Sequence, residues 1–106
     1  MKVVRSSDHA WQPVGIDGIE KAVLWRGGHE VIGELFRLKA GADYPPHTHV
    51  GWEQMFMISG RILIDDSEEL GPGEYCFTAP GETHHVQILE DTVIFLSFGK
   101  HYTPES

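Results

Sequence analysis

The chain of 106 residues contains a single cysteine, Cys76. One cysteine cannot form an internal disulfide, so nothing points to an oxidising compartment, and we expect Cys76 to be a small buried residue of a strand. No apolar run approaches the roughly 18 residues of a membrane-spanning helix, and the N-terminus lacks the apolar core of a signal peptide. The sequence therefore predicts a cytoplasmic protein with no membrane segment.

Basic residues are also scarce. Eight lysines and arginines stand against sixteen aspartates and glutamates, which gives a net charge of -8. Such a chain repels phosphate backbones and anionic lipid, so we expect no nucleic acid and no membrane surface among its partners. A small anionic substrate is still compatible with this charge, because a bound cation can dominate the field inside its own pocket.

Long helical periodicity is missing as well. Twelve glycines and six prolines separate short apolar runs such as 19–26, and this punctuation is typical of strands and turns. We count roughly eight short strands, with a hairpin predicted around Ser59-Gly60 and at most one helical turn near Ser6 to Trp11. The pattern predicts an all-β, antiparallel sandwich or barrel.

The stretch "PPHTHVGWEQ" concentrates residues that bind metals. His47 and His49 are two positions apart, so in a strand both imidazoles project from one face. Glu53 has the same parity, but in a straight strand it would lie roughly 13 Å beyond His49. A shared site therefore requires a bend, which Gly51 permits. The two prolines before His47 indicate that this end of the strand is not paired in the middle of a sheet.

A second histidine pair, His84-His85, follows the turn sequence "APGET". Adjacent strand residues face opposite sides, so only one of the two imidazoles can share the inner face with His47. Parity groups His84 with the apolar Val86 and Ile88. We therefore predict that His84 points inward and that His85 lies outside or at the rim.

The first histidine motif resembles that of the cupin superfamily. The cupin pattern is glycine, five residues, His-x-His, three or four residues, glutamate, six residues and glycine. Every interval matches in this chain, through Gly41, His47, His49, Glu53 and Gly60. This agreement identifies the chain as similar to small, single-domain (RmlC-like) cupins.

The second cupin motif is present in a degenerate form. Gly73, Gly81 and His84 match its spacing, whereas Ala79 replaces the usual proline and Ile88 the usual asparagine. The metal ligand of the motif is retained. The resemblance spans about 35–98.

The resemblance implies a double-stranded antiparallel β-barrel of the jelly-roll type, with one cupin domain over 1–106, its barrel core at about 31–99 and an N-terminal strand and arm at 1–30. It also implies one divalent transition metal ion, with four ligands: His47, His49, Glu53 and His84. Nitrogen and oxygen donors suit Fe, Mn, Ni, Cu or Zn, and the sequence does not choose among them. Small cupins commonly pair, so a homodimer is expected.

Strand parity predicts the walls of the pocket. From Glu53 it places Met55 and Met57 inward, and from His84 it adds Val86 and Ile88. The last strand offers either Val93, Phe95 and Ser97 or Ile94, Leu96 and Phe98, and Phe95 is taken as the wall residue. These mostly apolar side chains favour a small, partly hydrophobic organic ligand.

Charged residues near the predicted barrel leave alternatives open. Glu34 alternates with Leu35 in its run, and the side that faces the core is ambiguous. Arg26, Arg37 and Arg61 are candidates to hold a substrate carboxylate, although surface pairing with the many acidic residues is the more common role.

Three functions are compatible with these residues. The first is a metal-dependent enzyme for small molecules, most concretely a dioxygenase acting on an enol, diketone or aromatic-type substrate. The second is a non-redox cupin that isomerises or opens a sugar acid. The third is a non-enzymatic sensor of a metal or small ligand. The sequence assigns no catalytic residue beyond the metal ligands.

Overall fold

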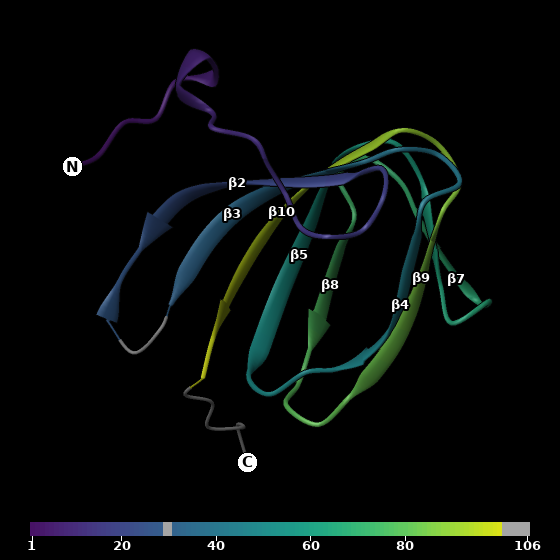
Figure 1. The fold of residues 1–106 in the computed structure, drawn as a ribbon. Coiled ribbons are helices and arrows are strands. Elements are labelled where there is room, and N and C mark those ends of the chain that lie inside the picture. The colour runs from purple at the N-terminus through teal and green to yellow at the C-terminus, as the bar shows by residue number, and fades with distance from the viewer. Residues whose placement is uncertain (29–30, 101–106) are drawn as a thin grey trace.

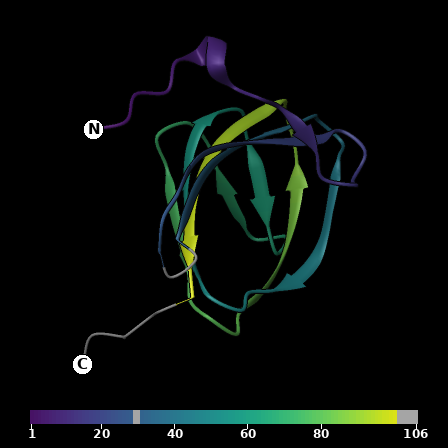
Figure 2. The same cartoon turned by 60° about the vertical axis from the view of Figure 1, so that its left-hand side comes forward.

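The computed structural model describes residues 1–28 and 31–100, which fold into two antiparallel sheets that face each other (Figures 1 and 2). The six-stranded sheet has the order β1-β2-β3-β10-β5-β8, and the four-stranded sheet has the order β4-β9-β6-β7. The first sheet comprises β1 (Gln12–Pro13), β2 (Ile19–Arg26), β3 (Ile32–Leu38), β10 (Thr92–Gly99), β5 (Trp52–Ser59) and β8 (Tyr75–Thr78). The second comprises β4 (Asp43–Thr48), β9 (Thr83–Ile88), β6 (Ile62–Ile64) and β7 (Glu68–Leu70). The predicted all-β barrel is confirmed.

The hydrophobic core lies between the inner faces of the two sheets. It forms because apolar side chains alternate with polar ones along most strands, so each sheet has one apolar face to bury. Met57 and Ile62 are almost fully buried at 0% and 1% exposure, and they mark the centre of the closed half of the barrel. The other buried members of this cluster are Ile19, Phe36, Leu38, Met55, Ile64, Ile88, Ile94 and Leu96.

The predicted hairpin at Ser59-Gly60 is wrong. The strand before it, β5, pairs with β10 and β8, whereas the strand after it, β6, pairs with β7 and β9. The turn therefore carries the chain from one sheet to the other. Gly60 has φ +88°, and a Cβ there would lie 2.4 Å from the carbonyl oxygen of Asp91, so only glycine fits this crossing.

Two short strands exceed the predicted count. β1 lies in a segment expected to be a surface approach, and β7 in a segment expected to be a polar turn. Both sit at the edge of a sheet, where few apolar residues are needed. The helical turn near the N-terminus is a single 3₁₀ turn at Ser6–Asp8, outside the barrel (Figure 1). No helix among the described residues is long and apolar enough to span a membrane.

A bulge at Pro45 and Pro46 changes which side chains of β4 face inward. Tyr44 is opposite Val86 and His47 is opposite His84, so the two prolines together span one residue of β9. Simple alternation would place Tyr44 and His47 on opposite faces, but the extra residue lets both face the interior. β4 is the edge strand of its sheet, as the proline pair predicts.

Candidate metal centre

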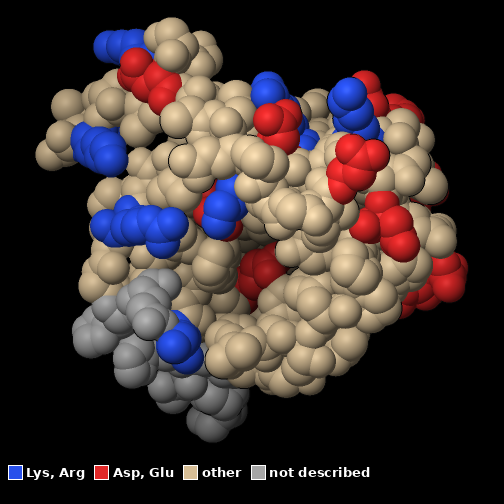
Figure 3. Space-filling view, viewed as in Figure 1, with Lys and Arg blue, Asp and Glu red and all other residues tan. Residues whose placement is uncertain are grey.

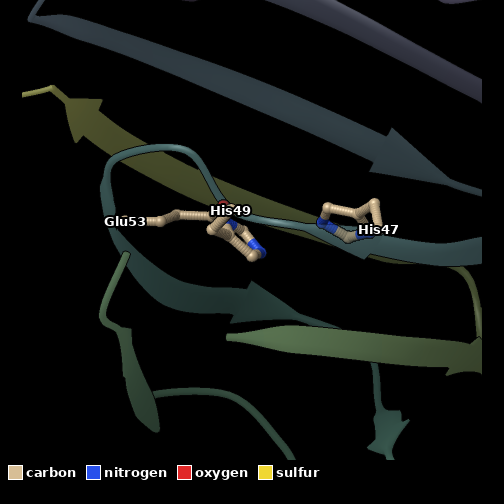
Figure 4. Close-up of side chains that lie close together, drawn as sticks. All are labelled: His47, His49 and Glu53. Atoms are coloured by element: carbon tan, nitrogen blue, oxygen red, sulfur yellow. Dashed lines mark ion pairs between the residues drawn. The ribbon is translucent and has the colours of Figure 1, made fainter. Parts of the chain in front are cut away.

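Three of the predicted ligands converge at one point of the barrel interior. One donor atom from each of His47, His49 and Glu53 lies within 4.8 Å of the other two. Nδ1 of His49 is 2.9 Å from Oε2 of Glu53, and the two imidazole centroids are 4.6 Å apart. Figure 4 shows the Glu53 side chain pointing toward His49, with His47 further along the same segment.

The bend that joins these residues is built on a glycine. His49 follows the end of β4 and Glu53 is the second residue of β5, so the chain crosses between sheets at Val50-Gly51. A Cβ on Gly51 would lie 2.0 Å from the carbonyl oxygen of Gly99, which excludes any larger residue without movement of the backbone. The backbone of His49 is fixed on its other side by hydrogen bonds with Gly81 and Glu82. The predicted bend at Gly51 is confirmed.

The donor set fits a divalent transition metal ion. Two imidazoles and one carboxylate are ligands that such ions accept, and no thiolate lies among them. Two donors that occupy adjacent positions around an ion at ~2.1 Å are themselves about 3 Å apart, close to the 2.9 Å between His49 and Glu53.

Burial shapes the electrostatics of the centre. Desolvation raises the pKa of Glu53 to about 7, with the nearby His84 opposing the shift. Desolvation also lowers the pKa of His49, and His47 lowers it further. Without an ion the site therefore disfavours charge on both side chains. A bound cation reverses this preference for the carboxylate, because it supplies the opposite charge that the apolar surroundings lack.

The predicted fourth ligand, His84, faces the interior but stands apart from the other three. It is opposite His47 in the β4–β9 register, and its ring centroid is 6.0 Å from that of His49. Nδ1 of His84 donates a hydrogen bond to Oδ2 of Asp65 at 3.0 Å. His85 faces away from the cavity, with Nε2 2.9 Å from Oδ1 of Asp43. Ligation of an ion by His84 stays a prediction.

The donors lie where a small internal cavity meets a wide mouth. The internal cavity holds about 80 Å³ and is lined mainly by apolar side chains, together with His47, His49, Glu53 and His84. The mouth holds about 780 Å³ and is more polar. Figure 3 shows a hollow in this face with acidic atoms at its floor, and the described acidic residues that line the mouth are Glu34 and Glu53.

The predicted wall residues have three different outcomes. Met55, Val86 and Ile88 line the internal cavity. Met57 is fully buried in the core and is not among the residues that line it. The prediction for Phe95 is wrong.

Phe95 lies on the outer face of its sheet. Its cross-strand neighbours are Leu35 and Phe56, and the inward set of β10 is Ile94, Leu96 and Phe98. Parity within β10 allowed either set. The pairing register of β10 with β3 and β5 determines which of the two sets faces inward, and this register cannot be read from the sequence of β10 alone.

Two residues of the site were missed at the level of the sequence. Tyr44 lines both cavities, and its ring lies 4.8 Å from that of His47. Tyr44 is three residues before His47, so simple alternation would turn it outward. The bulge at the two prolines turns it inward. Glu34 also lines the mouth. Its alternation with Phe36 and Leu38 was visible, but a charged residue on an inner face is uncommon enough to leave the face undecided.

The three arginine candidates differ in whether they pair with an acidic residue on the surface or line the mouth. Nη2 of Arg37 is 2.9 Å from Oε1 of Glu20, and its guanidinium lies 4.3 Å from the ring centroid of Trp11. Nε of Arg61 is 3.1 Å from Oε1 of Glu69. Arg26 alone lines the mouth.

A family model described as the ChrR cupin-like domain matches residues 1–103. The chain belongs to this cupin family. Its resemblance to cupins, inferred from the two motifs, is therefore confirmed, and so is the jelly-roll fold.

Three known proteins illustrate how far this similarity extends. The Arabidopsis thaliana DNA damage-repair/toleration protein DRT102 is 30% identical over 73 residues, which is 64% of this cupin and 24% of that protein. The anti-sigma factor ChrR, solved in complex with Rhodobacter sphaeroides SigE, gives a TM-score of 0.76 at 24% identity, over 88% of this chain and 50% of that chain. An acetylacetone dioxygenase from Acinetobacter johnsonii gives 0.79 at 17% identity, over 93% of this chain and 72% of that chain.

These similarities are too partial to transfer the activity of a whole relative to this chain. The cupin described here spans about a quarter of DRT102 and half of the ChrR complex chain. At identities below 25%, the similarity to the two solved structures shows the shared fold alone. Function must come from the site itself.

Proposed function

We propose that this cupin is a metal-dependent enzyme that acts on a small organic molecule, and that its most concrete form is a dioxygenase for an enol, diketone or aromatic-type substrate. The observation that carries the proposal is the convergence of His47, His49 and Glu53 at the inner end of an open mouth. A purely structural ion needs no such access, whereas a substrate does. The shared fold of an acetylacetone dioxygenase supports the choice.

His84 is proposed as the fourth ligand. The carboxylate of Asp65 accepts a hydrogen bond from Nδ1 of His84 and another from the backbone N–H of His85, at 3.0 and 2.9 Å. With Nδ1 committed to Asp65, Nε2 is the nitrogen left for an ion. Carboxylate–imidazole pairs of this kind fix the ring orientation and tautomer of metal-binding histidines.

A divalent transition ion, whether Fe, Mn, Ni, Cu or Zn, would supply Lewis acidity and open coordination positions at this centre. The side chains of the protein perform the remaining tasks. Met55, Val86 and Ile88 exclude water from the inner cavity. Trp52 and Phe98 give the mouth apolar surface for an organic ligand.

Two other functions compete with the dioxygenase. Arg26 at the mouth favours a non-redox cupin for sugar acids, since it is placed to hold a carboxylate. The family description and the ChrR structure favour a non-enzymatic sensor of a metal or small ligand. We also propose that the protein is cytoplasmic. We propose in addition that it forms a homodimer, because the outer face of β5 and β8 exposes the large apolar side chains Phe56, Ile58 and Tyr75.

The proposal is tested by metal analysis of protein purified without oxygen, followed by oxygen uptake with acetylacetone and other enols and diketones. We expect close to one transition metal ion per chain and oxygen uptake with at least one compound. His49→Ala should lose metal and turnover together, whereas His85→Ala, which alters an outward-facing imidazole of the same chain, should retain both. Turnover without oxygen would favour the sugar-acid function, and metal binding with no turnover would favour a sensor. A His49→Ala variant with full metal content and turnover would contradict the proposed site.

A further inference from the structure

One carboxylate oxygen of the mouth is buried with no hydrogen-bond partner in the part of the chain that the structure describes. Glu34 lies on the inner face of β3 and is 2% exposed, and its Oε2 atom has no hydrogen-bond partner among the described residues. The nearest cation is Nζ of Lys21 at 3.8 Å, too far for a hydrogen bond. A buried and incompletely paired carboxylate destabilises a fold. Packing alone therefore does not explain Glu34.

Glu34 faces the same space as the metal-binding residues. It lines the mouth together with Tyr44, His47 and Glu53. Burial is the main cause of the raised pKa of Glu53, and the charge of Glu34 adds to it, as it does for Tyr44. Glu34 and the ligand cluster therefore border one continuous space, which a single small molecule can occupy.

The charge balance of the mouth differs from that of the whole chain. Among the residues that the structure describes, the mouth is lined by Lys21, Arg26 and Lys100, three of the eight basic residues of the protein, and by the acidic Glu34 and Glu53. The chain as a whole carries twice as many acidic as basic residues. A local excess of cations in an acidic protein focuses negative ligands on this opening, and a bound divalent ion would strengthen the effect.

We propose that Glu34, Lys21 and Arg26 form a polar subsite of the mouth that selects a small carboxylate bearing a hydroxyl or enol group. The hydroxyl donates a hydrogen bond to Oε2 of Glu34, and the carboxylate of the ligand is held by Lys21 and Arg26. The inference deepens the proposed function, on which it rests for the reacting centre, by making the substrate a hydroxy or enol acid rather than a neutral diketone. Glu34 is then a residue that determines specificity.

The test measures three probes by calorimetric titration of the full chain, both metal-free and loaded with zinc. Mandelate carries both groups, phenylacetate lacks the hydroxyl, and mandelamide lacks the charge. In the unmodified protein we expect mandelate to bind about tenfold more tightly than phenylacetate, because a hydrogen bond to a charged acceptor contributes roughly that much. Acetylacetone, which is neutral, should bind more weakly than mandelate to the metal-free form.

Variants assign the preference to individual residues. Glu34→Gln should reduce the mandelate-to-phenylacetate ratio to about twofold, since the amide is a weaker acceptor than a carboxylate. The matched control is Glu20→Gln, an exposed carboxylate on the outer face of β2, which should keep the tenfold ratio. Lys21→Gln combined with Arg26→Gln should weaken mandelate and phenylacetate by the same factor and leave mandelamide unchanged. Lys39→Gln, on an exposed turn, is the control for these cations.

A stability measurement separates this assignment from a structural role. If Glu34 serves ligand binding, the melting temperature of Glu34→Gln should equal or exceed that of the parent protein, because a buried and incompletely paired charge is removed. A melting temperature lowered by several degrees, together with an unchanged binding ratio, would make Glu34 a structural ion-pair residue and overturn the subsite.

The remaining outcomes keep the two proposals distinct. Failure to take up zinc or any other transition metal would remove the proposed function, but discrimination between the probes by the metal-free protein would still support the subsite. Conversely, normal metal uptake with equal affinity for mandelate and phenylacetate, or with no binding of mandelate at millimolar concentration, would overturn the subsite and leave the metal centre standing.

Discussion

The two halves of the barrel interior differ in the polarity of their side chains. In the closed half, Met57 and Ile62 belong to a cluster of apolar side chains that are almost fully buried. In the open half, His49 and Glu53 are partly buried and Glu34 is buried, and Oε2 of Glu34 has no hydrogen-bond partner among the described residues. The closed half stabilises the fold, whereas the polar groups of the open half cost stability and form the candidate metal centre.

The largest effect on stability is expected from the closed half. Met57→Ala removes a side chain that is 0% exposed, and the loss of buried surface plus the cavity left behind should cost about 2–5 kcal/mol of unfolding free energy. Urea denaturation of the metal-free protein measures this change. Ile58→Ala, the next residue of β5 on the outer face, is the control and should cost much less because its side chain is 48% exposed. Equal losses in both variants would break the comparison.

The next effect concerns the bend that connects the halves. Gly51→Ala forces the new Cβ against the carbonyl oxygen of Gly99, so the backbone must shift, at a cost of about 1–3 kcal/mol. Because Glu53 follows two residues later, metal affinity should fall in the same variant. Gly28→Ala, at a position where an added Cβ meets nothing within 4 Å, is the control. Unfolding curves and a zinc titration on the same samples check both effects. Unchanged zinc affinity would show that the bend does not position Glu53.

A smaller effect, confined to the open half, is expected at Asp65. Asp65→Asn keeps a residue that tolerates the φ of +50° but weakens acceptance from Nδ1 of His84. If His84 is the fourth ligand, metal affinity should fall by about 10–100-fold, with little change in unfolding free energy. A competition titration against a chelator measures the affinity. The adjacent Asp66→Asn, at φ +59°, is the control, and equal affinities in the two variants would argue against ligation by His84.

The smallest effect is the pH dependence of stability caused by Glu34. Burial raises the pKa of Glu34 above its ordinary value near 4.5, with Lys21 and then Arg26 opposing the shift. The neutral carboxyl is therefore favoured by folding. Its contribution to stability is complete below pH 4.5 and is lost as the pH rises through the folded-state pKa.

Thermal melts of metal-free protein between pH 4 and 8 check this sign. The melting temperature of Glu34→Gln relative to the parent protein should be nearly unchanged at pH 4 and should rise as the pH increases. Glu20→Gln, on the exposed outer face, should show no such trend. A difference that is constant with pH would mean that Glu34 is not destabilised by burial, which would weaken the contrast between the two halves.

The sequence by itself determined the class of fold and pointed to the residues of the candidate metal centre. Short apolar runs between glycines and prolines predict strands, and the intervals around His47, His49 and Glu53 match one family closely. These features are local, because the period of a strand and the spacing of a motif are written along the chain.

Only the tertiary structure decided which side chains surround those residues. The bulge at Pro45 and Pro46 turned Tyr44 inward, register against β3 and β5 turned Phe95 outward, and the crossing at Gly60 sent β6 to the other sheet. The face of a strand depends on its partners and on bulges, and one extra residue reverses every side chain beyond it. For the same reason, the sequence showed that Glu34 alternates with its apolar neighbours, but only the assembled sheet placed its carboxylate at the mouth of the barrel.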